Sequence, residues 1–202
     1  MNTHRLASLS LSLLALLAGT AARADTNLLA NGDFESFAPQ VADGTYTTIS
    51  AGSTLGAWTV SGMSVDLIRN AYGAINNVSI DLAGTPGPGY IAQSFNAVAG
   101  TTYTLAWDYF KNGDGSTLTV GFGGNSTDYA APAGVTHASL DWTASVSGLQ
   151  TLTFGTASNG VQGPVLDNVT LSAMPVPEPD SYALLLAGLG CMAWVARRRQ
   201  AR

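Results

Sequence analysis

Residues that could perform catalysis are few in the central part of this 202-residue chain. Its only histidine between positions 25 and 174 is His137, in a Thr-His-Ala-Ser stretch that is typical of a strand edge. A serine-histidine-aspartate site would have to use this histidine, yet no nucleophile-elbow sequence accompanies it. No phosphate-binding loop, zinc-ligand spacing or dinucleotide fingerprint occurs either. We therefore predict no catalytic residues, no enzyme activity, and a surface position for His137.

Aromatic and polar side chains offer a different chemistry, the recognition of sugars. Aromatic faces pack on the C–H patches of a sugar ring, while amides and carboxylates bind its hydroxyls. The candidates for ligand binding are Trp58, Trp142 and Tyr46, with Tyr72 and Tyr129 on expected loops. Trp107 lies in an alternating stretch and is expected in the core. For each of the other aromatics, core packing is the alternative to binding.

Charge is distributed unevenly along the chain. Only two of the eight basic residues, Arg69 and Lys111, lie between Asp25 and Asp180, and all thirteen acidic residues lie there, which gives that segment a formal charge of −11. Such a segment repels phosphates, so we exclude nucleic acid as a partner. The only cysteine, Cys191, lies after this segment, which can therefore form neither a disulfide nor a thiolate metal site.

The N-terminus has the features of a secretory signal peptide. Arg5 provides a short basic region, an apolar run follows over residues 6–19, and Ala22-Arg23-Ala24 fits the small-x-small cleavage pattern. We expect the secretion machinery to recognise a signal helix over residues 1–24, with cleavage before Asp25. An uncleaved N-terminal anchor is the alternative, although the run is shorter than the ~20 residues of a spanning helix.

The C-terminus combines prolines, an apolar stretch and arginines. The segment 175–179 reads Pro-Val-Pro-Glu-Pro and is too rich in proline for a helix. Residues 182–196 are apolar, and Arg197, Arg198 and Arg199 follow them. We predict a single transmembrane helix over 182–196, slightly short for a bilayer, with the arginines on the cytoplasmic side.

This order of elements over residues 175–202 resembles the PEP-CTERM sorting signal, with the motif intact at Val176, Pro177, Glu178 and Pro179. The resemblance implies recognition by an exosortase-type membrane protease, which releases or transfers the protein at the envelope. It implies transient anchoring in the inner membrane, followed by a place on the outer surface or in the extracellular matrix. An ordinary C-terminal membrane anchor after a proline linker is the alternative.

The segment between the two ends alternates like a β-sandwich. Short runs of apolar and polar residues, separated by Gly, Asn, Asp and Pro, predict about nine strands around one core. The clearest run places Tyr103, Leu105, Trp107 and Tyr109 on one face of a strand. The turn signal over residues 112–115 is expected to join two antiparallel neighbours. We predict an all-β jelly-roll sandwich over residues 25–174.

Several motifs of this segment are similar to galactose-binding-like jelly rolls, which include carbohydrate-binding modules and the plant cell-wall domain of unknown function. Residues 27–35 (Asn-Leu-Leu-Ala-Asn-Gly-Asp-Phe-Glu) resemble their opening strand, and residues 164–171 resemble their closing strand. Residues 58–60, 64–68, 79–84 and 91–95 resemble the choice-of-anchor C domain in their order. Related jelly rolls often hold a structural calcium between the first and last strands. The resemblance therefore implies a calcium site at Glu35 and Asp167, with Asp33 less favoured. Hydrogen bonding of these carboxylates to backbone at strand ends is the alternative.

These features favour a non-enzymatic envelope or matrix protein, important for the matrix of a biofilm, whose sandwich binds exopolysaccharide or another surface glycan. This expectation follows from the fold resemblance and the export route. A structural matrix protein that self-associates or binds other surface proteins without sugar is the alternative. A secreted hydrolase is a third hypothesis, for which the thirteen acidic residues do not single out one catalytic pair.

Overall fold

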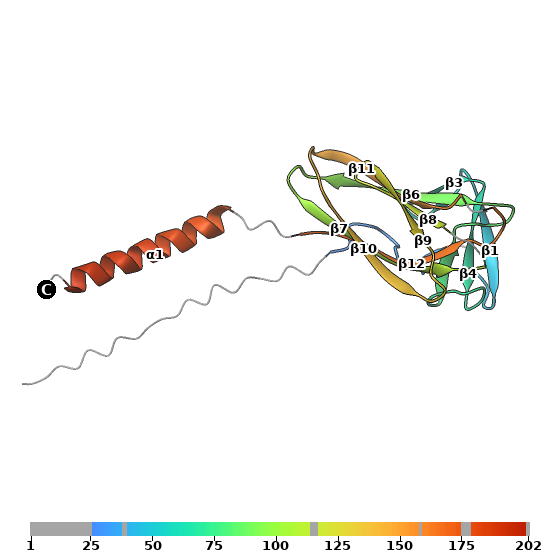
Figure 1. The fold of residues 1–202 in the computed structure, drawn as a ribbon, viewed down its shortest axis with the longest axis horizontal. Coiled ribbons are helices and arrows are strands. Elements are labelled where there is room, and N and C mark those ends of the chain that lie inside the picture. Colours follow the sequence, from blue (N-terminus) through green and yellow to red (C-terminus); the bar gives the residue numbers. More distant parts are fainter. Residues whose placement is uncertain (1–25, 38–39, 114–116, 158, 175–178, 201–202) are drawn as a thin grey trace, which may run out of the picture.

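The computed structural model describes residues 26–37, 40–113, 117–157, 159–174 and 179–200. The expected signal helix, 1–24, lies outside them, as do Val176, Pro177 and Glu178. Within the described part, two antiparallel sheets stack face to face (Figure 1). The first sheet, sheet A, has the order β1 (Thr45–Ser50), β4 (Ser64–Arg69), β5 (Val78–Asp81), β12 (Pro164–Ala173), β7 (Thr102–Lys111) and β10 (Thr136–Thr143).

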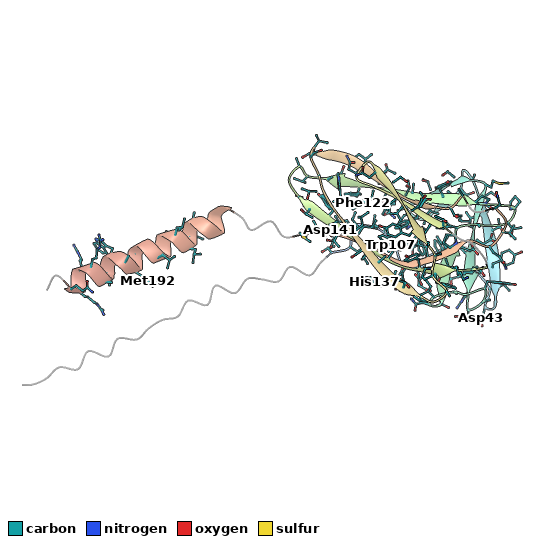
Figure 2. All side chains as sticks on the ribbon, viewed as in Figure 1. Asp43, Trp107, Phe122, His137, Asp141 and Met192 are labelled. Atoms are coloured by element: carbon teal, nitrogen blue, oxygen red, sulfur yellow. The ribbon has the colours of Figure 1, made fainter. Side chains whose placement is uncertain are left out.

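The second sheet, sheet B, has the order β2 (Thr54–Leu55), β3 (Trp58–Gly62), β6 (Gly89–Ala97), β11 (Gly148–Gly155), β8 (Thr117–Phe122) and β9 (Asn125–Ala130). This architecture confirms the predicted all-β sandwich. The alternation along β7 is as expected, because Tyr103, Leu105, Trp107 and Tyr109 are all buried. Trp107 lies in the layer of side chains between the sheets, whereas His137 lies at the surface (Figure 2).

Two details of the strand pattern differ from the prediction. The turn after β7 does not join antiparallel neighbours, because β7 belongs to sheet A and β8 to sheet B. Instead, Gly123 and Gly124, with φ of 62° and 80°, close the β8–β9 hairpin, as this turn geometry requires. The strands β1, β2, β9 and β10 lie at the sheet edges and raise the number above nine. The residues of β1 and β9 lack the apolar alternation that marks a strand in a sequence, whereas β10 alternates with Ala138, Leu140 and Trp142 on its half-buried face.

The N-terminal segment closes the sandwich by pairing with the last strand. Leu28 N donates to Leu171 O at 2.8 Å, and Val169 N donates to Gly32 O at 2.8 Å. Gly32 approaches β12 so closely that an added Cβ would lie 1.9 Å from Val169 O. Behind this contact, Phe34 is fully buried and packs on Trp58, with ring centroids 5.8 Å apart. Glycine at position 32 is therefore a steric requirement of the closure.

A C-terminal helix, α1 (Pro179–Gln200), follows the sandwich and ends with three arginines in its last turn. None of the helices in the described ranges is long and apolar enough to cross a membrane. This corrects the transmembrane helix expected over 182–196. The apolar stretch is shorter than the ~20 residues that a span requires, and it is bounded by Asp180 on one side and by the three arginines on the other.

Replacing Gly32 tests the closure of the sandwich. We expect Gly32→Ala to lower the free energy of unfolding by about 2–3 kcal/mol, because the new methyl group collides with the backbone of β12. Urea unfolding of the full-length protein measures the change. Gly134→Ala is the matched control, because its Cβ would have no atom within 4 Å. Equal stability of the two variants would contradict the steric role of Gly32.

Candidate functional site

Two of the cavities on the described part of the sandwich are relevant to function. The larger, about 530 Å³, lies along the sandwich edge and is lined by Glu35, Ser36, Phe37, Gln40, Thr47, Ile49, Thr54, Leu55, Gly56 and Leu67. The smaller, about 150 Å³, is lined by Tyr46, Asp66, Ile68, Tyr72, Asp81, Thr85, Asn112, Val161 and Gln162. We name the smaller one the tyrosine pocket. It combines aromatic rings, carboxylates and amides, which is the combination that a polar ligand requires.

Two tyrosines form the mouth of the tyrosine pocket. Tyr46 lies on β1 opposite Ile68 of β4, and Tyr72 lies in the loop that follows β4. Their rings meet edge to face, with centroids 5.5 Å apart, and the side chains remain 44% and 53% exposed. Tyr72 holds a φ of 51°, which is unusual for a bulky residue. Strained backbone of this kind concentrates at binding sites.

Two carboxylates lie side by side at the base of the pocket. Asp66 on β4 is the register partner of Asp81 on β5. Their neighbours Leu67 and Ile80 point into the core, so both carboxylates are on the outer face of sheet A. They are nevertheless only 5% and 3% exposed. The loops that cover this face bury them.

Each of these carboxylates organises a loop. Asp66 accepts hydrogen bonds from the backbone N–H and the hydroxyl of Thr85, both at 3.2 Å. Asp81 Oδ1 accepts from the N–H groups of Ala83 and Gly163, each at 2.9 Å, and its Oδ2 accepts from Asn112 Nδ2 at 2.8 Å. Every oxygen of the pair is thus engaged by a loop. This arrangement suits the shaping of a binding pocket better than proton transfer.

Burial raises the pKa of Asp81 from 3.8 to about 6, although its three hydrogen bonds oppose the shift and the charge of Asp66 adds to it. A perturbed carboxyl in a pocket marks a functional-site candidate. With exposed aromatic faces at the mouth and hydrogen-bonding groups below, the arrangement can stack on a small ring and bind its polar substituents.

The structure brings Glu35 and Asp167 to the same junction, as the jelly-roll resemblance implied. Glu35 accepts hydrogen bonds from Val78 N at 2.8 Å and from Asn77 Nδ2 at 2.5 Å. Asp167, fully buried, accepts from Asn168 N at 2.7 Å and from Ser79 Oγ and Asn76 Nδ2, both at 3.2 Å. Burial chiefly, with a contribution from the charge of Glu35, raises the pKa of Asp167 to about 6.

These residues do not form a good fit to calcium. The ion takes six to eight oxygens, and the described residues contain no group of three or more His, Cys, Asp or Glu side chains able to hold a metal. The amide oxygen of Asn77 accepts a hydrogen bond from Arg69 Nε at 3.0 Å. Turning this oxygen towards an ion would break that bond. Asp33 is exposed, and its carboxylate lies near Glu35 N. Each carboxylate accepts one backbone N–H group, as in the alternative, and side chains supply the other donors; calcium stays a prediction of the resemblance.

The other candidate aromatics lie away from the tyrosine pocket. Trp58 has no exposed surface and donates its indole N–H to Asn31 O at 3.1 Å, so no surface ligand can reach it. Trp142 stacks on Tyr103, with centroids 5.9 Å apart, and Tyr129 packs edge-on against Trp107. Of Trp58, Trp142 and Tyr46, only Tyr46 lines the tyrosine pocket.

Sequence reasoning missed the polar residues of the tyrosine pocket. Asp66 and Asp81 were available as a signal, because each interrupts an otherwise apolar strand. An acid in such a strand requires dedicated partners when it is buried. Asn112 and Gln162 carried no comparable signal, since they lie in loops that only the fold brings to this face.

His137 is exposed, as predicted, and lies on edge strand β10. Its Nδ1 is 2.8 Å from Asp108 Oδ1, and the other oxygen of Asp108 accepts from Asn168 Nδ2 at 2.8 Å. Asp108 is the register partner of His137 and of Asp167. This network joins three neighbouring strands and is separate from the residues that line the tyrosine pocket.

Comparison with known families identifies two parts of the chain. Residues 27–172 match the family described as "Protein of unknown function (DUF642)". The chain belongs to this DUF642 family. Residues 175–200 match the PEP-CTERM protein-sorting motif, which confirms the sorting tail predicted from the proline motif. Such a motif implies an exported, envelope-sorted protein that an exosortase-type membrane protease processes. The finer resemblance to the choice-of-anchor C domain stays a prediction.

Solved structures show more distant likenesses to this DUF642 domain. Tailspike protein 4 of bacteriophage CBA120, in its enzymatically active domain, is 14% identical over 73% of this chain and 21% of its own, with a TM-score of 0.46. TmCBM61 in complex with β-1,4-galactotriose is 15% identical over 73% and 98%, with a TM-score of 0.40. A family 35 carbohydrate-binding module from Clostridium thermocellum is 15% identical over 63% and 97%, with a TM-score of 0.39. No curated protein matches the sequence. These TM-scores are too low to transfer a ligand.

The raised pKa values of Asp81 and Asp167 predict stabilisation by mild acid. The folded state holds these protons up to about pH 6, whereas the unfolded chain releases them near 3.8. The folded state therefore binds more protons between these values, and its stability falls as the pH rises through 6. We expect a higher free energy of unfolding at about pH 5 than at about pH 7, measured by urea unfolding across a pH series.

Asp81→Asn should reduce the slope of stability against pH, whatever its effect on absolute stability. Asp128→Asn on the exposed strand β9 is the matched control and should keep the slope. A slope that is unchanged in Asp81→Asn would refute the assignment.

Removal of divalent cations tests the junction at Glu35. Because fixed N–H and O–H donors already satisfy this carboxylate and that of Asp167, we expect EDTA to leave the thermal midpoint unchanged. Differential scanning calorimetry of the full-length protein with added calcium or EDTA measures the effect. A midpoint that falls by several degrees in EDTA, and that Glu35→Gln renders insensitive, would establish calcium instead.

Proposed function

We propose that this exported DUF642 protein binds a glycan of the cell surface or its exopolysaccharide through the tyrosine pocket. The observation that carries the proposal is the pairing of Tyr46 and Tyr72 over the hydrogen-bonding groups of Asp66, Asp81 and Asn112. A sugar ring presents both C–H faces and hydroxyls, and this pocket presents a partner for each.

The size and position of the pocket support a ligand that is part of a chain. A volume of about 150 Å³ accommodates one sugar ring rather than an extended oligosaccharide. The exposed tyrosines keep the mouth open to solvent, so the neighbouring units of a polysaccharide can continue outwards. We infer that the pocket holds one unit, or the end, of a longer glycan.

The route of the protein supports the same class of ligand. The sorting motif at residues 175–200 directs the protein to the envelope, where surface polysaccharides are available. The strongly acidic segment between Asp25 and Asp180 repels polyanions such as nucleic acids. A protein in this place needs no enzyme activity to retain polysaccharide at the cell surface, and we propose that it acts by binding.

Removal of the tyrosine rings tests this function. We expect Tyr46→Ala and Tyr72→Ala each to weaken glycan binding by about five- to thirtyfold, since stacking on a ring contributes about 1–2 kcal/mol. Binding of full-length protein to a glycan array identifies the ligand, and calorimetry then measures the affinities of the variants. Leu149→Ala, which removes an exposed apolar side chain from sheet B, is the matched control.

Two results would contradict the proposal. One is the absence of glycan binding by the unmodified protein, particularly if it assembles with increasing concentration instead. The other is a glycan that binds both tyrosine variants as tightly as the unmodified protein.

A further inference from the structure

The tyrosine pocket has an unbalanced charge. Asp66 and Asp81 line it, and the groups that donate hydrogen bonds to them are neutral: backbone N–H groups, the Thr85 hydroxyl and the Asn112 amide. Neutral donors satisfy carboxylate oxygens without cancelling the negative charge. The pocket therefore keeps a negative potential near neutral pH.

Neither cation of the sandwich lines this pocket. Arg69 donates its Nε to Asn77 Oδ1 at 3.0 Å and its Nη1 to Val41 O at 3.1 Å, which directs the guanidinium towards the N-terminal segment. Lys111 is likewise not among the residues that line the pocket. The negative charge of Asp66 helps to raise the pKa of Asp81. This agrees with a pocket in which no cation offsets the two carboxylates.

The pair Tyr46 and Tyr72 adds a second reason for the pocket to prefer a cationic ligand. Aromatic faces attract cations through their quadrupole, and paired aromatic rings are a recurring device for binding ammonium groups. Here two exposed rings meet at 84°, and both line the same pocket as the carboxylates. A cation in this pocket would contact ring faces and negative charge together.

We propose that the tyrosine pocket selects a cationic amino sugar, a hexosamine unit with a free amine, over its neutral N-acetylated form and over uronates. The ammonium group lies towards Asp66 and Asp81, and the sugar ring packs on the tyrosines. A uronate in the same position brings its carboxylate against the two buried carboxylates, and like charges repel. This proposal rests on the glycan-binding function proposed above and specifies its ligand.

The test compares three short oligosaccharides near neutral pH: glucosamine oligomers, the same oligomers fully N-acetylated, and oligogalacturonate. The first two differ only at the amine. We expect the full-length protein to bind the amine form at least tenfold more tightly than the N-acetylated form, and oligogalacturonate more weakly than either. Calorimetry measures the three affinities.

A variant distinguishes attraction by the pocket carboxylates from attraction by the overall negative charge of the domain. Asp66→Asn keeps both contacts with Thr85, because the hydroxyl can accept from the new amide. We expect it to reduce the preference for the amine form several-fold. Asp128→Asn removes the same charge from β9 of sheet B and should leave the preference unchanged. Equal losses in both variants would mean non-specific attraction and would overturn the proposal.

An ammonium group also occurs in protein partners, so a lysine-rich peptide of matched charge is a further arm of the test. Tight peptide binding that Tyr46→Ala abolishes, without binding of glucosamine oligomers, would assign the pocket to a protein ligand and overturn the proposal. If the neutral oligomer binds as tightly as the amine form and Tyr46→Ala abolishes both, this inference fails while the glycan-binding function stands. If neither these oligosaccharides nor any glycan of the array binds, the glycan-binding function fails as well.

Discussion

The closure between the N-terminal segment and β12 is the contact on which the rest of this sandwich depends. Gly32 lies against the Val169 carbonyl with no room for a side chain. This approach allows Phe34 to fill the core beside Trp58 and places Glu35 where it accepts from Val78 N. The first residues of the domain are thereby joined to its last strand, in a segment that can form no disulfide. The close approach at Gly32 and the backbone hydrogen bonds to β12 therefore hold the two ends of the domain together without a covalent crosslink.

Burial of carboxylates on the outer face of sheet A has a comparable organising effect. A buried carboxylate is costly unless it is hydrogen-bonded, and here the donors come from loops. Asp81 holds residues 83 and 163, whereas Asp66 holds residue 85. The same bonds that satisfy the acids therefore shape the walls of the tyrosine pocket. The raised pKa of Asp81 lowers the stability of the fold near neutral pH, while its hydrogen bonds hold the pocket walls in place.

A strand could be predicted from the sequence where apolar and polar residues alternate clearly along it. Strands buried on one face, such as β7, were evident because apolar residues alternate along them. The edge strand β9 was less evident, since its residues are largely exposed. The turn after β7 was identified as a turn, but whether it joins partners in one sheet or crosses to the other depends on packing that no short motif encodes. Among the aromatics, Tyr46 and Trp58 have similar local sequences, and only burial separates them.

The sequence by itself determined the sorting tail, the acidity and thiol-free character of the sandwich, and its β-class, because each of these follows from composition, order or period 2 alternation. The tertiary structure decided which polar residues meet. Tyr46, Tyr72, Asp81 and Asn112 come from four separate parts of the chain, and their meeting depends on strand register and loop path. Register and loop path are set by long-range hydrogen bonds and by the packing of the core, and these are properties of the folded chain as a whole.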